Sequence, residues 1–410
     1  MTPALQTRPD VFDTVIVGAG VMGATTALFL ARGGQKVALV DRQDMFRAAS
    51  GVNAGTLTLH MTRAQLIPHA IRGREMWLDS ASWLGEDVGA LATPGLSMAF
   101  TEAEEELLRQ RARVRQDMGA PIEVVSPQEA VRIEPGVNPT LRAAAYCALD
   151  GHIPTYRVGG AYARALRQAG VTIIENSPVE AITPATGGGY DVRVSSRAQP
   201  VHGRRIVLST GAWLEKMLGW LGYTTPIRCL INQLVVTETL PPVMGSVLSI
   251  ANGLLSLKQF ANGSVLIGGG WQGEGNIHQG GTRVIPENLR GNVRLAQYVV
   301  PRLDEAQVLR VWLGLESETP DAMPLIGALT PDDDAFVVGC VHSGFTSGPY
   351  MGRLLAERIL GGNPDLSAFD PTRFPPPQPL DHTHDPSIPH AVPGCLCRNA
   401  GTLSGKRDAG

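Results

Sequence analysis

The stretch DTVIVGAGVMGATTALFLARGGQKVALVDR, residues 13–42, decides the fold of this chain. Its apolar run over residues 15–17 is too short for a helix and leads directly into glycine, so it predicts a buried strand. The pattern after the glycines predicts a helix over residues 21–32, and residues 36–40 predict a second strand. A strand, a helix and a strand in such close succession indicate a βαβ unit with parallel strands.

Three glycines connect the first strand to the helix at the spacing G-x-G-x-x-G. Gly18 allows a tight turn, Gly20 lets the backbone approach a pyrophosphate, and Gly23 lets the helix pack closely on the sheet. The helix then directs its first amides and its partial positive charge at the phosphates. Asp41 follows the second strand about 20 positions after Gly18, where a carboxylate that binds ribose is expected. Together these features predict a dinucleotide-binding site.

The size and charge of the chain limit its class. Its 410 residues have room for two or three domains of about 150 residues, and 43% apolar residues suffice for their cores. The formal net charge of −3 gives no electrostatic basis for binding nucleic acid or an anionic membrane. We therefore expect a small-molecule substrate and no nucleic-acid partner.

Residues 12–31 are apolar enough to suggest a signal peptide or a membrane segment. Asp13 interrupts the start of this run, and three glycines fall where a strand must turn. Neither a basic region nor an A-x-A cleavage pattern flanks it. We therefore expect no transmembrane segment and a cytoplasmic protein.

The five cysteines do not indicate a disulfide framework, because Cys147, Cys229 and Cys340 are scattered. A C-x-C at residues 395–397 could bind metal only with ligands from elsewhere. Beyond residue 375 the chain is rich in proline and polar residues, which predicts poor order. We expect no metal site, although this tail also contains the histidines His382, His384 and His390.

The middle of the chain predicts both helices and strands. Residues 63–119 show helical periodicity, with a capped helix that begins at Thr101, and Ser126 predicts the cap of a second short helix. A turn over residues 150–154 contains His152, which is either exposed or part of a site. A helix over residues 156–169 is then expected, followed by strands over residues 171–182, 190–195 and 205–209.

The second half of the chain predicts an antiparallel sheet. Residues 229–238, 256–259 and 265–269 have short β-like runs, and Asn262-Gly263 between the last two indicates a hairpin. Trp271 just past this hairpin packs on the sheet or forms the wall of a pocket, and we favour packing. The sequence therefore predicts an α/β fold, in which a Rossmann-like nucleotide domain carries a second, antiparallel-sheet substrate domain of α+β type.

Three further junctions bring small residues to strand ends. Residues 50–55 form either a phosphate-contacting loop or an ordinary surface loop, and the strand that ends at Ser209 meets the Thr210-Gly211 turn. A buried strand over residues 336–339 leads through a glycine-bearing loop to a helix over residues 349–360, with Ser347 as its expected cap. The start of that helix would stabilise negative charge on a ligand.

These motifs resemble the D-amino-acid oxidase superfamily of FAD-dependent oxidoreductases, especially the branch of glycine oxidase, sarcosine oxidase and opine dehydrogenase subunits. The resemblance covers residues 13–374 and follows the family order. Its pieces are GAGVMG with Asp41, ASGVNAG (49–55), DGHIP (150–154), LSTGAW (208–213), WLGLESETPDAMPLIG (312–327) and GCVHSGFTSGP (339–349).

The resemblance implies FAD rather than NAD, held noncovalently because no cysteine stands at the usual flavin-linkage position. It places the HSGFT loop at the pyrimidine edge of the flavin ring and the adenine near Val179. The cofactor-binding residues that it implies are Gly18, Ala19, Gly20, Val21, Met22, Gly23, Asp41, Arg42, Ser50, Asn53, Ala54, Gly55, Val179, Thr210, Gly211, Gly339, Gly344, Phe345 and Thr346.

The implied reaction is oxidation of a C–N bond in an amine, an amino acid or an opine, with hydride transfer to flavin N5 and hydrolysis of the imine in water. Flavin carries this chemistry, so no catalytic triad or metal motif is required. The implied domains are a discontinuous FAD-binding domain over residues 1–95, 150–225 and 320–374, a substrate domain over residues 96–149 and 226–319, and a disordered tail over residues 375–410.

The sequence departs from its relatives where they hold a substrate carboxylate. Glycine-oxidase-like proteins often have arginine at the position of Glu316, and sarcosine-oxidase-like proteins have lysine at the position of Thr346. They also have a lysine near the flavin that promotes reaction with oxygen, and residues 268–278 contain none. Glu316 either meets a cationic amine or is a surface carboxylate beside Arg310. The catalytic candidates are His342, Glu316, Thr346, Arg63 and His60.

Three alternatives remain at this point. The chain could be a flavoprotein subunit that passes electrons to a partner protein rather than to oxygen. It could be a nucleotide-binding protein without turnover. From the first βαβ unit alone, it could also be a nicotinamide-dependent dehydrogenase. We expect an FAD-dependent amine or amino-acid dehydrogenase or oxidase that forms little hydrogen peroxide in air.

Overall fold

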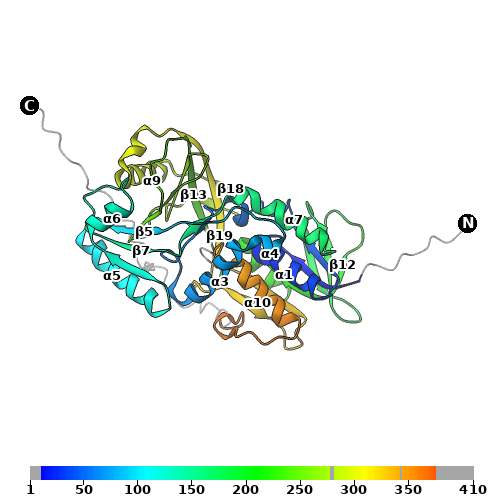
Figure 1. Cartoon of the computed structure of the whole chain (residues 1–410). Coiled ribbons are helices and arrows are strands. Elements are labelled where there is room, and N and C mark those ends of the chain that lie inside the picture. Colours follow the sequence, from blue (N-terminus) through cyan, green and yellow to red (C-terminus); the bar gives the residue numbers. More distant parts are fainter. Residues whose placement is uncertain (1–10, 278–280, 342–343, 375–410) are drawn as a thin grey trace, which may run out of the picture. The chain divides into compact units, whose positions relative to one another are not determined.

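The computed structural model describes residues 11–277, 281–341 and 344–374. The expected disordered tail, its C-x-C and its histidines lie outside these residues, as does His342. Within them, two eight-stranded sheets contain most of the strand residues (Figure 1). The predicted α/β class is confirmed, whereas the domain boundaries stay a prediction.

The first sheet has a parallel centre, as the βαβ pattern predicts. Strand β1 pairs in parallel with β2 on one side and β12 on the other, and β2 and β12 pair in parallel with β9 and β21. Antiparallel strands β10, β11 and β20 extend it. The strands are β1 (Val11–Val17), β2 (Val37–Val40), β9 (Thr172–Ile174), β10 (Val179–Pro184), β11 (Tyr190–Val194), β12 (Val201–Leu208), β20 (Leu325–Ala328) and β21 (Ala335–Gly339).

Alternating side chains of these strands enter two different cores. In β2, Val37 and Leu39 join a core that includes buried residues of four long helices, whereas Ala38 and Val40 face the opposite side. The four helices are α1 (Val21–Arg32), α3 (Ile67–Leu78), α7 (Val158–Gln168) and α10 (Gly348–Ile359). Helix α8 (Leu214–Trp220) contributes Leu214 and Leu218 to the opposite core. Both faces of the sheet are therefore buried, which is usual for parallel strands.

The second sheet is mostly antiparallel and uses strands from both halves of the chain. Its order is β19-β13-β16-β15-β14-β5-β7-β6, and only the β14–β5 pair is parallel. The strands are β5 (Gly95–Ala99), β6 (Ile122–Val125), β7 (Ala143–Cys147), β13 (Arg228–Thr239), β14 (Val247–Ile250), β15 (Ser256–Gln259), β16 (Ser264–Gly268) and β19 (Val308–Glu318).

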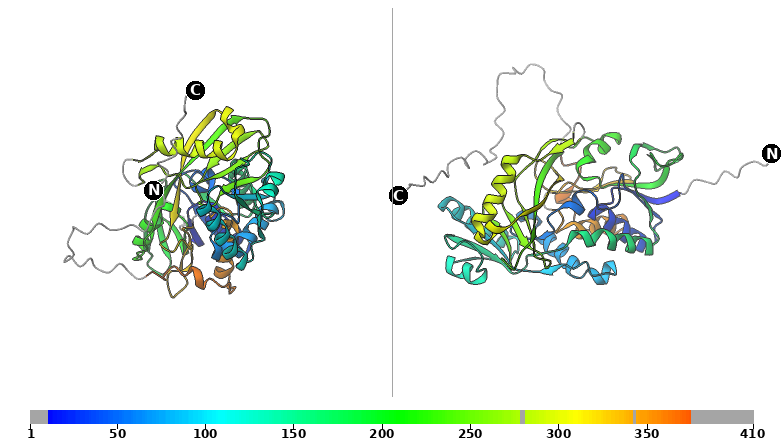
Figure 2. Two further views of the ribbon diagram at one scale, coloured as in Figure 1. Left: turned by 90° about the vertical axis from the view of Figure 1, so that its left-hand side faces the viewer. Right: turned by 90° about the horizontal axis from the view of Figure 1, so that it is seen from above.

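Helices cover both faces of this sheet. Helix α9 (Pro286–Val299) and helix α6 (Pro127–Ile133) pack on the face that Ala144 of β7 enters. Helix α5 (Glu102–Asp117) packs on the other face, against Ala143 and Ala145. Figures 1 and 2 show α9 and α5 on opposite sides of the β5–β7 part of the sheet. The period-two alternation of β7 thus separates two cores.

Shorter elements complete the fold. Strands β3 (Thr56–Leu57), β8 (Gly151–His152) and β4 (Leu91–Ala92) form a small sheet, and β17 (Glu274–Asn276) pairs with β18 (Gly281–Arg283). Two short α-helices are α2 (Ala49–Val52) and α4 (Ser80–Leu84). The single turns of 3₁₀-helix are η1 (Ala64–Leu66), η2 (Thr155–Arg157), η3 (Gly211–Trp213), η4 (Pro301–Glu305) and η5 (Ser367–Phe369).

Several local predictions are confirmed. Helix α1 has the predicted bounds. Thr101 and Glu104 form a capping box at the start of α5, and the Ser126 side chain caps α6. Gly263 has φ +86° in the turn between β15 and β16, as the Asn-Gly pair requires. Trp271 packs as favoured, because its indole N–H donates to Leu254 O and its ring lies against Gly291.

Other local predictions are wrong. The helical interpretation of residues 63–119 misses β5, a fully buried strand, because periodicity does not separate short apolar runs into helix and strand. The turn over residues 150–154 contains β8, and His152 there is buried. Residues 171–182 form two strands, since Asn176 between them has φ +53°. Ser347 precedes α10 but its hydroxyl bonds Met351 Sδ instead of capping.

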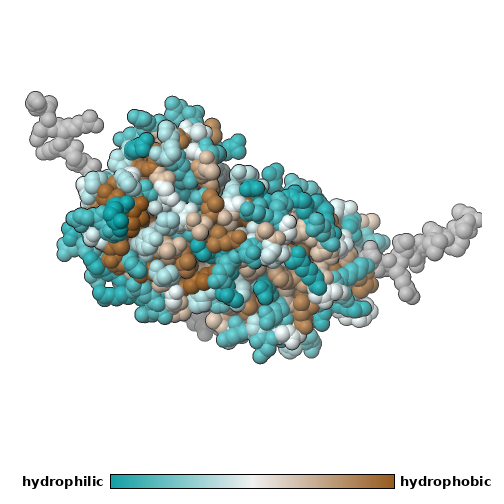
Figure 3. Space-filling model, viewed as in Figure 1, coloured by the Kyte–Doolittle hydropathy of each residue, from teal (hydrophilic) through white to brown (hydrophobic). Residues whose placement is uncertain are grey.

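The structure contains no helix, among the described residues, that is long and apolar enough to cross a membrane. On the face shown in Figure 3, hydrophilic residues cover much of the surface and apolar residues form separate patches. The expected cytoplasmic location stays a prediction.

Candidate functional site

A cavity of about 770 Å³ is lined by both sheets. The first sheet contributes the turn after β1, the end of β2, and the segments that follow β12 and β21. The second sheet contributes β13, β19 and the loop after β14, and α5 adds residues from its cavity-facing side. Segments distant in sequence therefore meet around one space that is large enough for a cofactor and a small ligand.

The glycines of the first turn sit where no side chain fits. Gly18 has φ +108°, and a Cβ there would overlap the carbonyl oxygen of Ser209. A Cβ on Gly23 would overlap Gly18 O, so α1 can pack on the turn only without a side chain. A Cβ on Gly20 would lie 2.9 Å from the Ser50 hydroxyl. These overlaps agree with the roles that the G-x-G-x-x-G spacing predicts for Gly18 and Gly23.

Polar groups organise the nucleotide end of the cavity. The Asp41 carboxylate accepts hydrogen bonds from Ala19 N at 2.7 Å and Gln43 N at 2.9 Å. Burial raises the pKa of Asp41, and the two backbone N–H groups oppose that shift. Ser50 Oγ accepts from Val21 N, the first amide of α1, at 2.9 Å.

A stacked arginine–tryptophan pair borders the end of the cavity next to Asp41. The Arg42 guanidinium lies 3.5 Å from the centre of the Trp213 ring, and both residues line the cavity. Thr210 also lines it, and its hydroxyl is buried without a hydrogen-bond partner among the described residues. Buried polar atoms are rarely left unsatisfied. The glycine cradle and this hydroxyl therefore fit a bound dinucleotide.

The loop before α10 is fixed by packing. The carbonyl of Phe345 accepts from Trp77 Nε1 at 2.9 Å, and the two rings stack with centres 4.9 Å apart. Thr346 donates its hydroxyl to Thr56 O at 3.2 Å. A Cβ on Gly73 of α3 would overlap Thr346 O, so α3 supports this loop closely. The predicted flavin-contacting segment is therefore held rigidly at the cavity wall.

His60 lines the cavity and is held at one ring nitrogen. Its Nδ1 lies 3.0 Å from Asp150 Oδ2, and its Nε2 is buried without a partner among the described residues. Asp150 is itself held by Leu59 N at 2.8 Å and by the Thr58 hydroxyl at 2.8 Å. This chain of contacts fixes the imidazole and orients Nε2 for a ligand.

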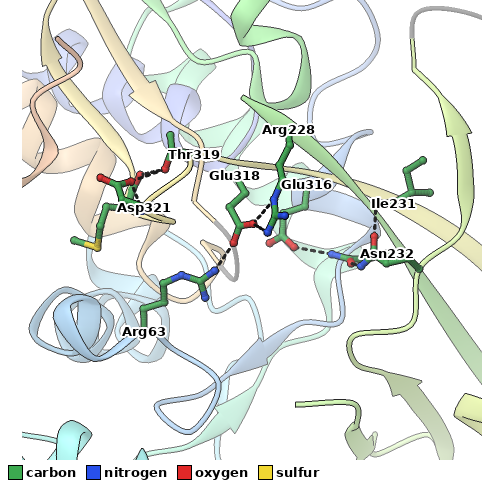
Figure 4. Close-up of polar contacts among 10 residues, drawn as sticks. Arg63, Arg228, Ile231, Asn232, Glu316, Glu318, Thr319 and Asp321 are labelled. Atoms are coloured by element: carbon green, nitrogen blue, oxygen red, sulfur yellow. Dashed lines mark hydrogen bonds and ion pairs between the residues drawn. The ribbon is translucent and has the colours of Figure 1, made fainter. Parts of the chain in front are cut away.

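Strands β13 and β19 carry a cluster of amides and a carboxylate. Glu316 accepts from Asn232 Nδ2 at 2.6 Å, and Asn232 Oδ1 accepts from Gln272 Nε2 at 2.5 Å (Figure 4). Glu316 lines the cavity, which favours the alternative in which it meets a ligand over that of a surface carboxylate beside Arg310. Gln233 on β13 is fully buried, and both polar atoms of its side chain lack partners among the described residues.

A buried carboxylate fixes Arg63. Glu318, 3% exposed, pairs with Arg63 through one oxygen and with Arg228 through the other, as Figure 4 shows. Arg63 lines the cavity, and its side chain is 31% exposed. Glu318 therefore positions Arg63 at the cavity and offsets part of its charge.

The second sheet also buries a lysine. Lys258 of β15 is 1% exposed, and its Nζ donates to the Thr56 hydroxyl at 2.7 Å. Burial lowers the pKa of Lys258 from 10.5 to about 7. Residues 268–278 contain no lysine. The buried amino group of this sheet is instead that of Lys258 on β15.

The lowered pKa of Lys258 predicts that the stability of the folded protein depends on pH. The unfolded chain binds more protons than the folded chain between pH 7 and pH 10, so raising the pH favours the folded state. Relative to Lys258→Met, the wild type should gain up to about 1.4 kcal/mol per pH unit over this window. Thermal unfolding of both proteins at pH 7 and pH 9 measures it. Lys36→Met, which removes an exposed lysine, should show no such dependence, and equal pH slopes for all three proteins would contradict the prediction.

The structure brings most predicted site residues to one cavity. Ala19, Gly23 and Gly55 lie outside its lining, and His342 lies outside the described residues. The predicted residues that line it are Gly18, Gly20, Val21, Met22, Asp41, Arg42, Ser50, Asn53, Ala54, Val179, Thr210, Gly211, Gly339, Gly344, Phe345, Thr346, Glu316, Arg63 and His60. Their individual roles stay predictions.

Some residues of the site were not predicted. Asn232 and Gln272 are ordinary polar residues in or beside a strand, and only the strand pairing shows that they meet. Asp150, by contrast, stands in the DGHIP motif that the sequence did single out.

The comparison with protein families identifies the class. The family model described as DAO, FAD dependent oxidoreductase, matches residues 13–358. The chain therefore belongs to this family and is an FAD-dependent oxidoreductase, which rules out the nicotinamide-dependent alternative and the protein without turnover.

Individual relatives are similar over most of the chain. An opine oxidase subunit of Agrobacterium tumefaciens (strain Ach5) is 28% identical, over 88% of this chain and 97% of the relative. Glycine oxidase of Bacillus licheniformis is 26% identical, over 85% of this chain and 93% of the relative. The crystal structure of glycine oxidase from Geobacillus kaustophilus superposes with a TM-score of 0.82 at 24% identity, covering 89% of this chain and 100% of that chain. That structure supports the fold.

Proposed function

We propose that this protein oxidises the C–N bond of an amine, an amino acid or an opine. The observation that carries the proposal is that His60, whose Nε2 has no partner among the described residues, and Glu316 line the cavity that also contains the nucleotide loop. Its relatives include proteins named for glycine and opine oxidation. An amine substrate suits these groups, since a carboxylate and a neutral imidazole can both accept hydrogen bonds from it.

We place FAD along the predicted cofactor residues. The turn at Gly18 and Gly20 would hold the pyrophosphate at the start of α1, and Asp41 and Arg42 would lie at the adenosine end. Thr210 would donate its buried hydroxyl to the cofactor. When bound, FAD supplies the two-electron oxidation by accepting a hydride from the carbon next to nitrogen.

The chain's own residues would prepare the substrate. An amine must lose its ammonium proton before its carbon can give up a hydride, and His60 Nε2 is a suitable acceptor because Asp150 holds Nδ1. Glu316 would orient the nitrogen, and the packed Phe345–Thr346 segment would fix the orientation of the substrate. Water then hydrolyses the released imine.

Anaerobic reduction tests the proposal. The purified protein, loaded with FAD, is mixed without oxygen with a panel of secondary amines, opines and D- and L-amino acids. We expect bleaching of the visible flavin band by at least one of them. If hydroxy acids alone bleach the flavin, C–N oxidation is the wrong reaction class.

A second candidate is a flavoprotein subunit that passes its electrons to a partner protein. Two relatives carry names of subunits, one from an opine oxidase and the other the hydrogen cyanide synthase subunit HcnC of Pseudomonas aeruginosa. HcnC is 23% identical over 89% of this chain. These names favour an electron-accepting partner protein, and copurification of a second polypeptide from the native source would support it.

This candidate predicts slow reaction with oxygen. We expect the amine-reduced protein to form hydrogen peroxide at least tenfold more slowly in air than it reduces a soluble electron acceptor such as a phenazine dye. A coupled peroxidase assay and dye bleaching on the same sample measure the two rates. Peroxide formation that keeps pace with flavin reduction would show an oxidase.

A further inference from the structure

Lys258 of β15 carries an amino group into the interior of the second sheet without a carboxylate to balance its charge. The side chain is 1% exposed and does not line the cavity. Among the residues that the structure describes, its Nζ donates to the Thr56 hydroxyl, no carboxylate pairs with it, and burial is the cause of its lowered pKa. A buried ammonium group is costly unless negative charge is present nearby.

Thr56 connects this amino group to the cavity. Thr56 and Ser256 both line the cavity, and their hydroxyl oxygens lie 3.3 Å apart. Because Thr56 Oγ1 accepts a hydrogen bond from Lys258, its own proton is available for donation to Ser256. These contacts form a hydrogen-bonded path between the buried amino group and the cavity.

The two segments that are predicted to contact the flavin also meet at Thr56. Residues 53–55 precede it directly, and Thr346 donates its hydroxyl to Thr56 O at 3.2 Å. Strand β3, which contains Thr56, is held by its antiparallel pairing with β8. Lys258 is therefore one hydrogen bond away from a wall of the cavity that both segments share.

The neighbouring ionisable groups keep their charge over the range in which Lys258 titrates. His152 of β8 faces Lys258, and burial, and next Lys258 itself, lower the pKa of His152 to about 4, so this imidazole is neutral at pH 7. Along the sheet, the row of side chains that includes Lys258 continues through Leu266 and Val236 to Arg310. Arg310 is exposed and lies three strands away. Of these groups, Lys258 is the one that changes its charge close to pH 7.

We propose that Lys258 takes up a proton when the bound FAD is reduced and releases it when FAD is reoxidised. A hydride brings two electrons and one proton, so it adds one negative charge to FAD. An opposite charge nearby favours the charged form of an amine, and Lys258 has no other counter-ion among the described residues. The additional proton comes from solvent in the cavity through the hydroxyls of Ser256 and Thr56.

Lys258 is thus a positioning residue for charge on the cofactor, since it acts through Thr56 and does not line the cavity. The inference rests on the proposed placement of the flavin and is independent of the substrate that reduces it. It goes beyond C–N oxidation, because it concerns the protons that accompany any two-electron reduction of this protein.

The pH dependence of the reduction potential tests the proposal without an amine. The FAD-loaded protein is reduced by dithionite in the presence of a reference dye, and flavin absorption gives the reduced fraction. Each proton taken up with two electrons changes the equilibrium constant tenfold per pH unit, which corresponds to about 30 mV. From pH 7.5 to pH 8.5 we expect close to a hundredfold change, about 60 mV, for the wild type and a tenfold change, about 30 mV, for Lys258→Met.

Two further variants complete the experiment. Lys36→Met removes an exposed lysine and should keep the wild-type dependence. Equal pH dependences in the wild type and Lys258→Met would overturn the inference. If Lys258→Met does not retain FAD, the wild type alone decides, because a change of about 30 mV would show that no second proton is taken up.

Thr346→Val tests the placement of the flavin separately. Loss of the hydroxyl that bonds Thr56 should shift the flavin absorption band, whether or not Lys258 changes its charge. Equal pH dependences with a shifted band would refute proton uptake by Lys258 alone, and equal dependences with an unshifted band would refute the flavin placement as well. Bleaching by the amine panel does not depend on Lys258, so C–N oxidation is judged independently.

Discussion

Replacing Gly18 with alanine should abolish retention of FAD. Gly18 has φ +108°, and its added methyl group would meet the Ser209 carbonyl at the junction of β1, β12 and α1. The left-handed backbone alone costs a non-glycine residue about 1–3 kcal/mol. The overlap adds to this cost and moves the turn that would hold the pyrophosphate. We expect at least a tenfold loss of FAD affinity, since 1.4 kcal/mol corresponds to a factor of ten.

The flavin content of the purified protein and a titration of the apoprotein with FAD measure this effect. Gly188→Ala is the matched control, because Gly188 has φ +98° and a Cβ there would meet nothing within 4 Å. It carries the backbone strain without the overlap and should keep its flavin. Equal flavin content in Gly18→Ala and wild type would mean that the cofactor does not depend on this turn.

The nucleotide half of the site could be predicted from sequence because its signals are local. Gly18 is required by its φ of +108° and Gly23 by its overlap with Gly18 O, both within a single βαβ unit, and helix α1 follows directly. The Thr101–Glu104 capping box and the Asn262-Gly263 turn are equally local. Each of these features is decided by residues within a few positions of one another.

The substrate half could not be predicted in the same way. Asn232 and Glu316 face the cavity because β13 and β19 pair in a particular register, with Asn232 opposite Gly314 and Leu230 opposite Glu316. A shift of one residue would turn these side chains to the opposite face of the sheet. Likewise, Lys258 meets Thr56 across about two hundred residues of sequence. Such contacts depend on the assembled sheets.

His60→Gln should lower the limiting rate of anaerobic flavin reduction about 10²- to 10⁴-fold, the usual contribution of a general base. The imidazole is held at Nδ1 by Asp150 and lines the cavity, and its Nε2 has no partner among the described residues. Glutamine keeps a polar side chain of similar reach but does not accept a proton from an ammonium group.

The effect of His60→Gln on the limiting rate, compared with its effect on substrate affinity, separates a role as general base from a structural role. If His60 acts as the base, the limiting rate falls while FAD content and apparent substrate affinity change by less than about threefold. Asp150→Asn should lower the rate less, because the imidazole remains but loses its fixed orientation. His202→Gln is the control, since His202 forms a similar pair with Asp191 at 2.9 Å and does not line the cavity. A His60→Gln protein that binds amines weakly but reduces its flavin at the wild-type limiting rate would assign His60 to substrate binding instead of proton transfer.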